Sequence, residues 1–294
     1  MPNIGRGRRV HVYMLEFDIR QMTQDDVDPI LRLLTETFGP GFDDHWFSWK
    51  HVSGPWGSSP GWVAEDGGEL LGVRLFLPWQ FRHDQMIYRA MRPCDTATSP
   101  SARGRGVFRS LTRHAITTLE DVDFIFNTPN SNSRPGYLKM GFGEWGRVRQ
   151  RLSLIRPRQA ELSDDPDPPI VRTLGTDTDR EFLRWRYYEC PVLEYQSFGL
   201  KGEIQCGLIC RIRKWQGMRL LIASELWGNR RQQKALIQGA AVELGARLAW
   251  FAAPFPKTGL PWLPRPGTIV TGYDLRNPHP GLPSFSLGDV EDVL

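Results

Sequence analysis

Apolar and polar positions along the chain follow two different periods, and these periods predict which segments are helices and which are strands. Residues 23–38 show helical spacing, with a threonine placed as the N-cap and glycines and a proline at 39–41 that end the helix. Residues 16–20 have the pattern of a strand before that helix. Alternation over residues 61–76, interrupted by Asp66-Gly67-Gly68, predicts a β-hairpin.

The middle of the chain predicts a strand, a glycine-rich turn, a helix and a second strand, in that order. The first strand ends near Pro100, and residues 101–106 form the turn. Apolar side chains at positions 107, 111, 115 and 119 recur at helical spacing. The apolar run at 123–127 has the length of a short buried strand, and strands with charged residues over 143–154 complete this part of the sheet.

An acidic, proline-dense stretch divides the chain into two expected domains. Residues 164–169 read Asp-Asp-Pro-Asp-Pro-Pro, a composition that does not hold regular structure. We therefore expect a linker over 156–170, a first domain over 14–155 and a second over 171–294.

The second part repeats a short segment of the first. Residues 43–55 align without gaps with residues 179–191, so that Trp49 pairs with Trp185 and Lys50 with Arg186. Strand patterns follow over 202–214 and 218–226, then a helix over 231–248, a strand over 249–253 and one more strand in the tail, near residues 268–273. The second part has no Gly-x-Gly turn before its helix. It is either a degenerate copy of the first domain that does not bind a cofactor, or a chance similarity over one aromatic helix.

Composition and charge exclude several classes of function. The 294 residues carry a net charge of +4 without a dense basic run beyond residues 6–9, which does not favour nucleic-acid binding. There is no apolar run long enough to cross a membrane and no secretory signal. The four cysteines lack CxxC spacing, so we expect no metal site and no disulfide framework, but reduced thiols in the cytoplasm.

The turn at residues 101–106 has the composition of an anion-binding site. Gly104 and Gly106 allow positive φ and close approach to the backbone, and the helix that follows offers unpaired N–H groups. Arg103 and Arg105 add permanent positive charge. The turn lacks the Gly-Lys-Ser/Thr of a P-loop and the third glycine of a dinucleotide fingerprint. An ordinary strand-to-helix turn with surface arginines remains the alternative.

With the segments that follow, this turn resembles the GCN5-related N-acetyltransferase (GNAT) superfamily. The family's Q/R-x-x-G-x-G/A loop is similar to residues 101–106, although Ser101 replaces the first Gln or Arg, and its Tyr-x-x-x-Gly-Phe is matched by residues 137–142. The resemblance covers residues 17–152. It implies an α/β fold of the α+β kind, with a mixed, mostly antiparallel GNAT sheet flanked by helices and a second, degenerate GNAT-like lobe. It also implies an acyl-CoA, most commonly acetyl-CoA, as co-substrate, and no metal.

The resemblance assigns roles to particular residues. Tyr137 matches the general acid, and Asp95 is the candidate general base, acting through water; His51 and Glu65 are the other candidates for the base. The acceptor site is expected to include Trp46, His51 and Trp56. The cofactor-binding residues are Thr96, Ala97, Thr98, Arg103, Gly104, Arg105, Gly106, Val107, Phe108 and Asn130. The alternatives are packing for the aromatic residues and helix capping for Asp95 and Asn130.

The function expected from this resemblance is transfer of an acyl group from acyl-CoA to the amine of a small molecule. A tandem GNAT enzyme that uses aminoacyl-tRNA and a non-catalytic module that binds coenzyme A are the two alternatives. The repeated segment favours the first alternative, whereas the intact glycine-rich turn opposes it. The identity of the amine and the oligomeric state stay open, and a homodimer is compatible with the sequence.

Overall fold

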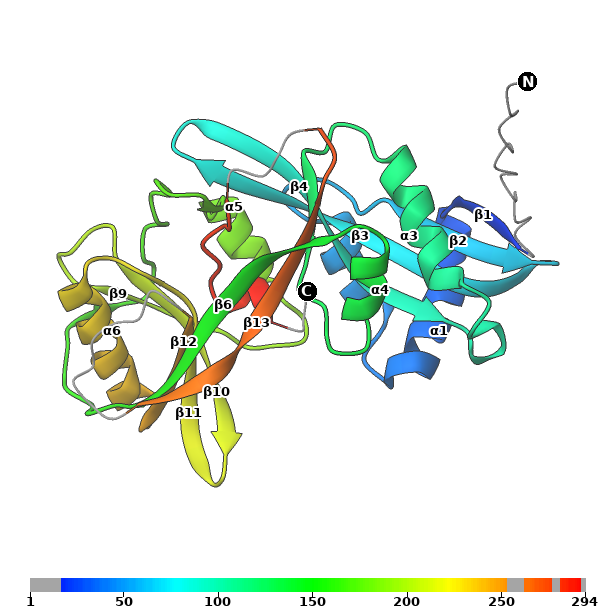
Figure 1. Ribbon diagram of the computed structural model, residues 1–294. Helices are drawn as coiled ribbons and strands as arrows, with labels where there is room; N and C mark the ends of the chain where they lie inside the picture. The colour runs from blue at the N-terminus through cyan, green and yellow to red at the C-terminus, as the bar shows by residue number, and fades with distance from the viewer. Residues whose placement is uncertain (1–16, 253–261, 277–280, 292–294) are drawn as a thin grey trace, which may run out of the picture.

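A computed structural model describes residues 17–252, 262–276 and 281–291, and over these residues the chain forms one long twisted sheet with helices packed on it (Figure 1). The described part of the sheet has 13 strands, in the order β1-β2-β3-β4-β5-β13-β6-β12-β11-β10-β9-β7, with β8 paired to β3. The described strand pairs are antiparallel except β4 with β5 and β11 with β12. This confirms the mixed, mostly antiparallel sheet expected from the sequence.

The strands and helices of the first half follow the predicted order. Its strands are β1 (Asp18–Gln21), β2 (Gly61–Asp66), β3 (Glu69–His83), β4 (Met86–Thr98) and β5 (Phe124–Asn127). Its helical segments are η1 (Gln24–Asp26), α1 (Val27–Phe38), α2 (Asp44–Phe47), η2 (Ser48–Val52), η3 (Pro100–Ala102), α3 (Val107–Thr118) and α4 (Arg134–Lys139). The main difference is length, because β3 and β4 run on as a long hairpin with Asp84 at its turn in a positive-φ conformation.

The second half contains the remaining elements. Its strands are β6 (Gly143–Leu154), β7 (Leu162–Ser163), β8 (Gly175–Thr176), β9 (Gln196–Leu200), β10 (Gly207–Trp215), β11 (Met218–Trp227), β12 (Leu248–Ala252) and β13 (Trp262–Asp274). Its helical segments are α5 (Arg180–Leu183), η4 (Arg184–Tyr188), α6 (Arg230–Glu243) and η5 (Gly288–Val290). The helix predicted over 231–248 ends earlier in the structure, at Glu243. It ends there because Gly245 adopts φ +61° and the chain turns back into β12. Strand β9 was not predicted.

Strands β6 and β13 join the two halves into one sheet. Strand β13 lies between β5 of the first half and β6, and β6 in turn pairs with β12 of the second half. In Figure 1 these two strands run side by side through the middle of the molecule. The chain therefore returns from the second half to complete the sheet of the first half. Within the expected linker, Leu162–Ser163 form the edge strand β7, which pairs with β9.

The two faces of the first half have separate cores. Along β3 the side chains alternate, so that Val73, Leu75 and Leu77 pack with α1 and α2 on one face. Phe76 packs on the opposite face, among residues of α3 and α4 that include Leu111. Side chains on neighbouring positions of β3 and β4 therefore reach different faces of the sheet.

Strand β4 contains a β-bulge where it pairs with β3. Cys94 pairs with Leu75 and Ala97 with Val73, so β4 has one residue more than β3 between these pairs. Asp95 lies in this bulge with φ +43°, which is rare for a residue other than glycine. Strand β4 pairs with β5 only at Ala90 and Met91, so the two parallel strands stop pairing several residues before the bulge.

The repeated segment is also a structural repeat. Asp43 accepts a hydrogen bond from Trp46 N (2.8 Å), and Asp179, 136 positions later, accepts one from Phe182 N (2.7 Å). Each short α-helix continues into one π-helical turn, η2 or η4. Trp49 and Trp185 stack with ring centroids 5.6 Å apart, and each indole N–H donates to the other's backbone carbonyl at 2.7 Å. The two copies of the segment therefore share their capping and π-helical geometry, and they contact each other.

Candidate functional site

The glycine-rich turn presents the start of α3 to solvent. Gly104 (φ +83°) and Gly106 (φ +81°) both need positive φ, and a Cβ at either position would meet nothing within 4 Å. The glycines therefore serve backbone conformation rather than space. Among the described residues no side chain caps the first turn of α3, and Arg103 is exposed beside it. Arg105 donates to Asp66 at 3.1 Å. The helix thus begins with N–H groups that are open to an anion.

The corresponding helix of the second half is closed at the same end. Asn229 accepts hydrogen bonds from the backbone N–H groups of Arg231 and Gln232, both at 3.0 Å. The Gln232 side chain accepts in return from Asn229 N at 2.8 Å, which completes a capping box. Because side chains of the chain itself use these N–H groups, α6 is a poor anion site and α3 is a good one.

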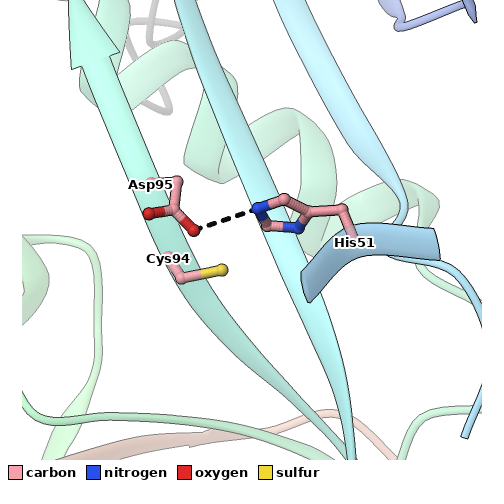
Figure 2. A group of neighbouring side chains, drawn as sticks. All are labelled: His51, Cys94 and Asp95. Atoms are coloured by element: carbon pink, nitrogen blue, oxygen red, sulfur yellow. Dashed lines mark ion pairs between the residues drawn. The ribbon is translucent and has the colours of Figure 1, made fainter. Parts of the chain in front are cut away.

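Asp95 lies at the centre of a buried cluster on the α2 face of the sheet. Its Oδ2 atom is 2.6 Å from Lys50 Nζ and 3.1 Å from His51 Nε2. Figure 2 shows His51 pointing from its helical segment towards Asp95 on the strand, with the Cys94 side chain beside them. His51 Nδ1 is 3.0 Å from Ser59 Oγ. Lys50 and His51 have almost no exposed side-chain surface, at 2% and 1%, so the ion pair is screened little by water.

The electrostatics of this cluster favour a charged Asp95 and a neutral His51. Burial alone would raise the pKa of Asp95, but Lys50 and His51 lower it well below the usual range. Burial lowers the pKa of His51 more than Asp95 raises it. A carboxylate held by an ammonium group at 2.6 Å is a weak proton acceptor. The cluster is thus better suited to stabilising the bulged backbone of β4 than to removing a proton from a substrate.

Potential metal-ligating atoms also meet in this cluster. Ligand atoms of His51, Cys94 and Asp95 lie within 4.8 Å of one another. Burial raises the pKa of the Cys94 thiol to about 12, which favours the neutral thiol. The Asp95 carboxylate already forms an ion pair with the Lys50 ammonium group.

Tyr137 lies on the opposite face, in contact with a buried arginine. Arg74 donates from Nη2 to the Tyr137 hydroxyl oxygen at 2.6 Å and from Nη1 to Thr96 Oγ1 at 3.0 Å. The Tyr137 ring packs edge-on against Phe108 of α3. The structure therefore brings together three of the predicted residues, Thr96, Phe108 and Tyr137, and separates Tyr137 from Asp95 by the thickness of the sheet.

The other predicted residues have structural partners. The Asn130 side chain accepts from the backbone N–H groups of Asn132 (3.0 Å) and Ser133 (2.9 Å), so it caps the turn before α4. Trp46 is buried and lies under the Lys50 ammonium at 5.1 Å. Trp56 stacks on Phe182, with centroids 5.1 Å apart. These contacts favour the packing and capping roles that the sequence left open for Asn130 and the tryptophans.

Reasoning from the sequence missed Lys50 and Arg74. Lys50 was noticed only as a member of the repeated segment, where it corresponds to Arg186. Arg74 stands inside the apolar run Leu70–Phe76, and a charge in a strand that is buried on both faces was the available signal. Neither partner, Asp95 or Tyr137, is near in sequence.

The second half carries a polar cluster at the equivalent position. A bulge in β11 at Ser224 corresponds to the bulge in β4, and Tyr187 of η4 donates to Glu225 Oε1 at 2.6 Å. Ser286 Oγ donates to the same oxygen at 2.7 Å. A hollow of about 270 Å³ lies here, lined partly by the chain's final described segment, including Asp289. In the second half, the chain's own final described segment therefore lines the hollow beside this cluster.

Comparison with known proteins places the first half in a family. Residues 18–145 match the model of the acetyltransferase (GNAT) domain. A search of curated proteins gave no match. None of the described helices has the length and apolar character needed to cross a membrane.

Solved structures share the fold at low sequence identity. A GCN5-related N-acetyltransferase from Anabaena variabilis superposes with a TM-score of 0.69 at 14% identity, over 88% of this chain and 73% of that chain. A conserved protein from Enterococcus faecalis gives 0.68 at 12% identity, over 88% and 72%. A GCN5-related N-acetyltransferase from Kribbella flavida gives 0.61 at 14% identity, over 89% and 72%. The chain thus carries a GNAT acetyltransferase domain over residues 18–145, the part that holds the glycine-rich turn and Tyr137, and it is an acyltransferase.

Proposed function

We propose that the protein transfers an acyl group, acetyl in the first instance, from acyl-CoA to the amine of a small molecule. The observation that carries this proposal is the uncapped start of α3, next to two parallel strands that stop pairing. A helix N-terminus with adjacent arginine is suited to a diphosphate, and an unpaired strand edge is suited to an extended amide chain. Coenzyme A contains both groups.

The diphosphate binds to the backbone N–H groups of residues 104–108, with Arg103 as the nearby cation. The pantetheine arm extends along β4 at residues 96–98, beyond the point where β5 leaves it. The thioester then lies beside the part of β4 that no longer pairs with β5. This placement leaves the α2 face for the acceptor amine and the α4 face for Tyr137.

In the reaction, the neutral amine attacks the thioester carbonyl and the carbon–sulfur bond breaks. A backbone N–H at Thr96 or Ala97 stabilises the oxyanion, and Tyr137 protonates the leaving thiolate. The lowered pKa of Asp95 and its pairing with Lys50 argue against the base role considered for it. Both ring nitrogens of His51 have partners, Asp95 and Ser59, and Glu65 is paired with Arg20, so the amine loses its proton to water. Asp95 instead holds the bulge in β4.

The test is thiol release from acetyl-CoA in the presence of a panel of amines, together with calorimetric titration of acetyl-CoA without an acceptor. We expect one acyl-CoA bound per chain and thiol release with at least one class of amine. A protein that binds acetyl-CoA but releases no thiol with any amine, and none with aminoacyl-tRNA, would instead be a coenzyme A-binding module. Failure to bind acetyl-CoA or a longer acyl-CoA would remove the proposal altogether.

A further inference from the structure

Arg74 is a buried cation with no carboxylate partner among the residues that the structure describes. It is 0% exposed, and its side chain donates to two neutral hydroxyl groups, those of Thr96 and Tyr137. The guanidinium lies over the rings of Phe108 (4.7 Å), Phe76 (5.3 Å) and Tyr137 (5.3 Å). Its Nε atom is buried and has no hydrogen-bond partner among the described residues.

This environment differs from that of Lys50 and Arg186, whereas Arg92, also buried, donates to two uncharged groups, the Asp289 backbone carbonyl (2.5 Å) and the Thr128 hydroxyl (3.4 Å). Lys50 contacts Asp95 at 2.6 Å, and Arg186 contacts Glu291 at 3.2 Å. A charge removed from water is costly unless an anion or a full set of hydrogen bonds compensates it. Aromatic faces compensate only in part for the lost hydration of the charge. The geometry therefore favours an anion that is formed or bound beside Arg74 during function.

The hydrogen bond to Tyr137 also determines where its proton points. An arginine only donates hydrogen bonds, so the Tyr137 oxygen is the acceptor in the 2.6 Å contact. The phenolic hydrogen must then point away from Arg74 and is available to another acceptor.

We propose that Arg74 is the positioning residue for Tyr137, and that it stabilises the phenolate that Tyr137 becomes when it protonates the leaving thiolate. The proposal rests on the proposed acyl transfer. In this step the Tyr137 O–H bond breaks and an S–H bond forms on coenzyme A. The electron pair stays on the phenolate oxygen, 2.6 Å from the Arg74 donor, and a proton from water later restores the phenol.

The experiment is a double-mutant cycle of Arg74→Met and Tyr137→Phe, measured as kcat and KM for acetyl-CoA. Methionine fills a similar volume without charge or donor. We expect Arg74→Met to lower kcat roughly 10²-fold while the KM for acetyl-CoA changes less than threefold, since general acids typically contribute 10²–10⁴-fold. In the Tyr137→Phe background the same change should have little further effect. Arg74→Gln, which keeps a donor without the charge, should be intermediate.

A second measurement separates this role from a structural one. In the Arg74→Met protein, a fluorinated tyrosine at position 137 supplies a more acidic phenol, and we expect it to recover part of the lost kcat. Replacing an uncompensated buried charge by an apolar side chain should leave the melting temperature unchanged or higher. Additive effects in the cycle, no recovery with the fluorinated tyrosine, or a kcat loss that follows a lower melting temperature would overturn the proposal. An inactive wild-type protein that fails to bind acetyl-CoA would overturn the proposed function as well, so the two failures are distinguishable.

Discussion

At the scale of single residues, two buried polar contacts have different roles in the site. Lys50 and Asp95 form an ion pair on one face of the sheet, and Arg74 and Tyr137 form a hydrogen bond on the other. The first contact stabilises a bulge whose positive φ is unfavourable for aspartate, and the second orients a phenol. The stability of the bulge depends on the first contact, because a buried carboxylate that loses its partner is costly.

Replacing Lys50 with methionine should destabilise the protein strongly. The change leaves the Asp95 carboxylate buried without its ammonium partner, and breaking a buried pair in this way costs about 3–5 kcal/mol. The control is Arg184→Met, which removes an exposed partner of Glu189 and should leave the melting temperature unchanged. Chemical denaturation of both variants checks the difference. Equal stability of the two would mean that the buried pair does not hold the bulge.

Replacing Tyr137 with phenylalanine should separate turnover from binding. The hydroxyl is the atom that we assign to proton transfer, so kcat should fall about 10²–10⁴-fold while calorimetry shows acetyl-CoA affinity within threefold of wild type. Tyr273→Phe is a suitable control, because Tyr273 packs against Phe142 on the same face. A large loss of affinity in Tyr137→Phe, with unchanged kcat, would assign the tyrosine to binding.

At the scale of elements, the two strand–helix junctions show how one architecture serves two purposes. Helix α3 follows a turn with two positive-φ glycines and has no side-chain cap. Helix α6 follows β11 almost directly and caps itself with Asn229 and Gln232. The first junction exposes N–H groups, whereas the second uses them, so only the first is suited to a diphosphate.

The turn before α3 should therefore be sensitive to substitution in a way that other glycine turns are not. Gly106→Val forces a β-branched side chain to adopt φ +81° and should weaken acetyl-CoA binding at least tenfold. Gly217→Val is a matched control, because Gly217 has φ +77°, has nothing within 4 Å of a Cβ and lies in the β10–β11 turn. Calorimetric titration compares the two variants, and equal affinities would argue against diphosphate binding at residues 104–108.

At the scale of the whole molecule, the shared strands make the two halves mutually dependent. Strand β13 completes the first half, and the segment after it packs into the second half beside β11. Glu225 and Asp289 are buried there, and Tyr187 and Ser286 hold one oxygen of Glu225. Burial first, then the neighbouring Asp289, raises the pKa of Glu225 to about 8.

This raised pKa predicts a stability that decreases with pH. The folded protein keeps a proton on Glu225 where the unfolded chain has lost it, so the contribution is complete below about pH 4. It is lost as the pH rises towards 8, by at most about 1.4 kcal/mol per pH unit. Thermal melts from pH 5 to 8 should show this decrease, and Glu225→Gln should flatten it. An identical pH dependence in both proteins would exclude Glu225 as its source.

The sequence by itself determined the local elements and the chemistry of the glycine-rich turn. Periodicity placed the hairpin at residues 61–76, helix α3 and strand β6, because the side-chain spacing of helices and strands is set by the backbone over a few residues. The turn at 101–106 was predictable because positive φ selects glycine at each position independently. The repeat at 43–55 and 179–191 was visible for the same reason, since its capping contacts are local.

Only the tertiary structure decided which side chains meet. Arg74 reaches Tyr137 across 63 positions of sequence, and the strand order that inserts β13 between β5 and β6 follows no local pattern. Such contacts depend on how the faces of the sheet are covered, and the buried surfaces that determine this come from distant parts of the chain. The same reason explains why Asp95 and Tyr137, both predicted for catalysis, lie on opposite faces of the sheet. Side chains along a strand alternate between the two faces, and the elements packed on each face determine which side chains meet there.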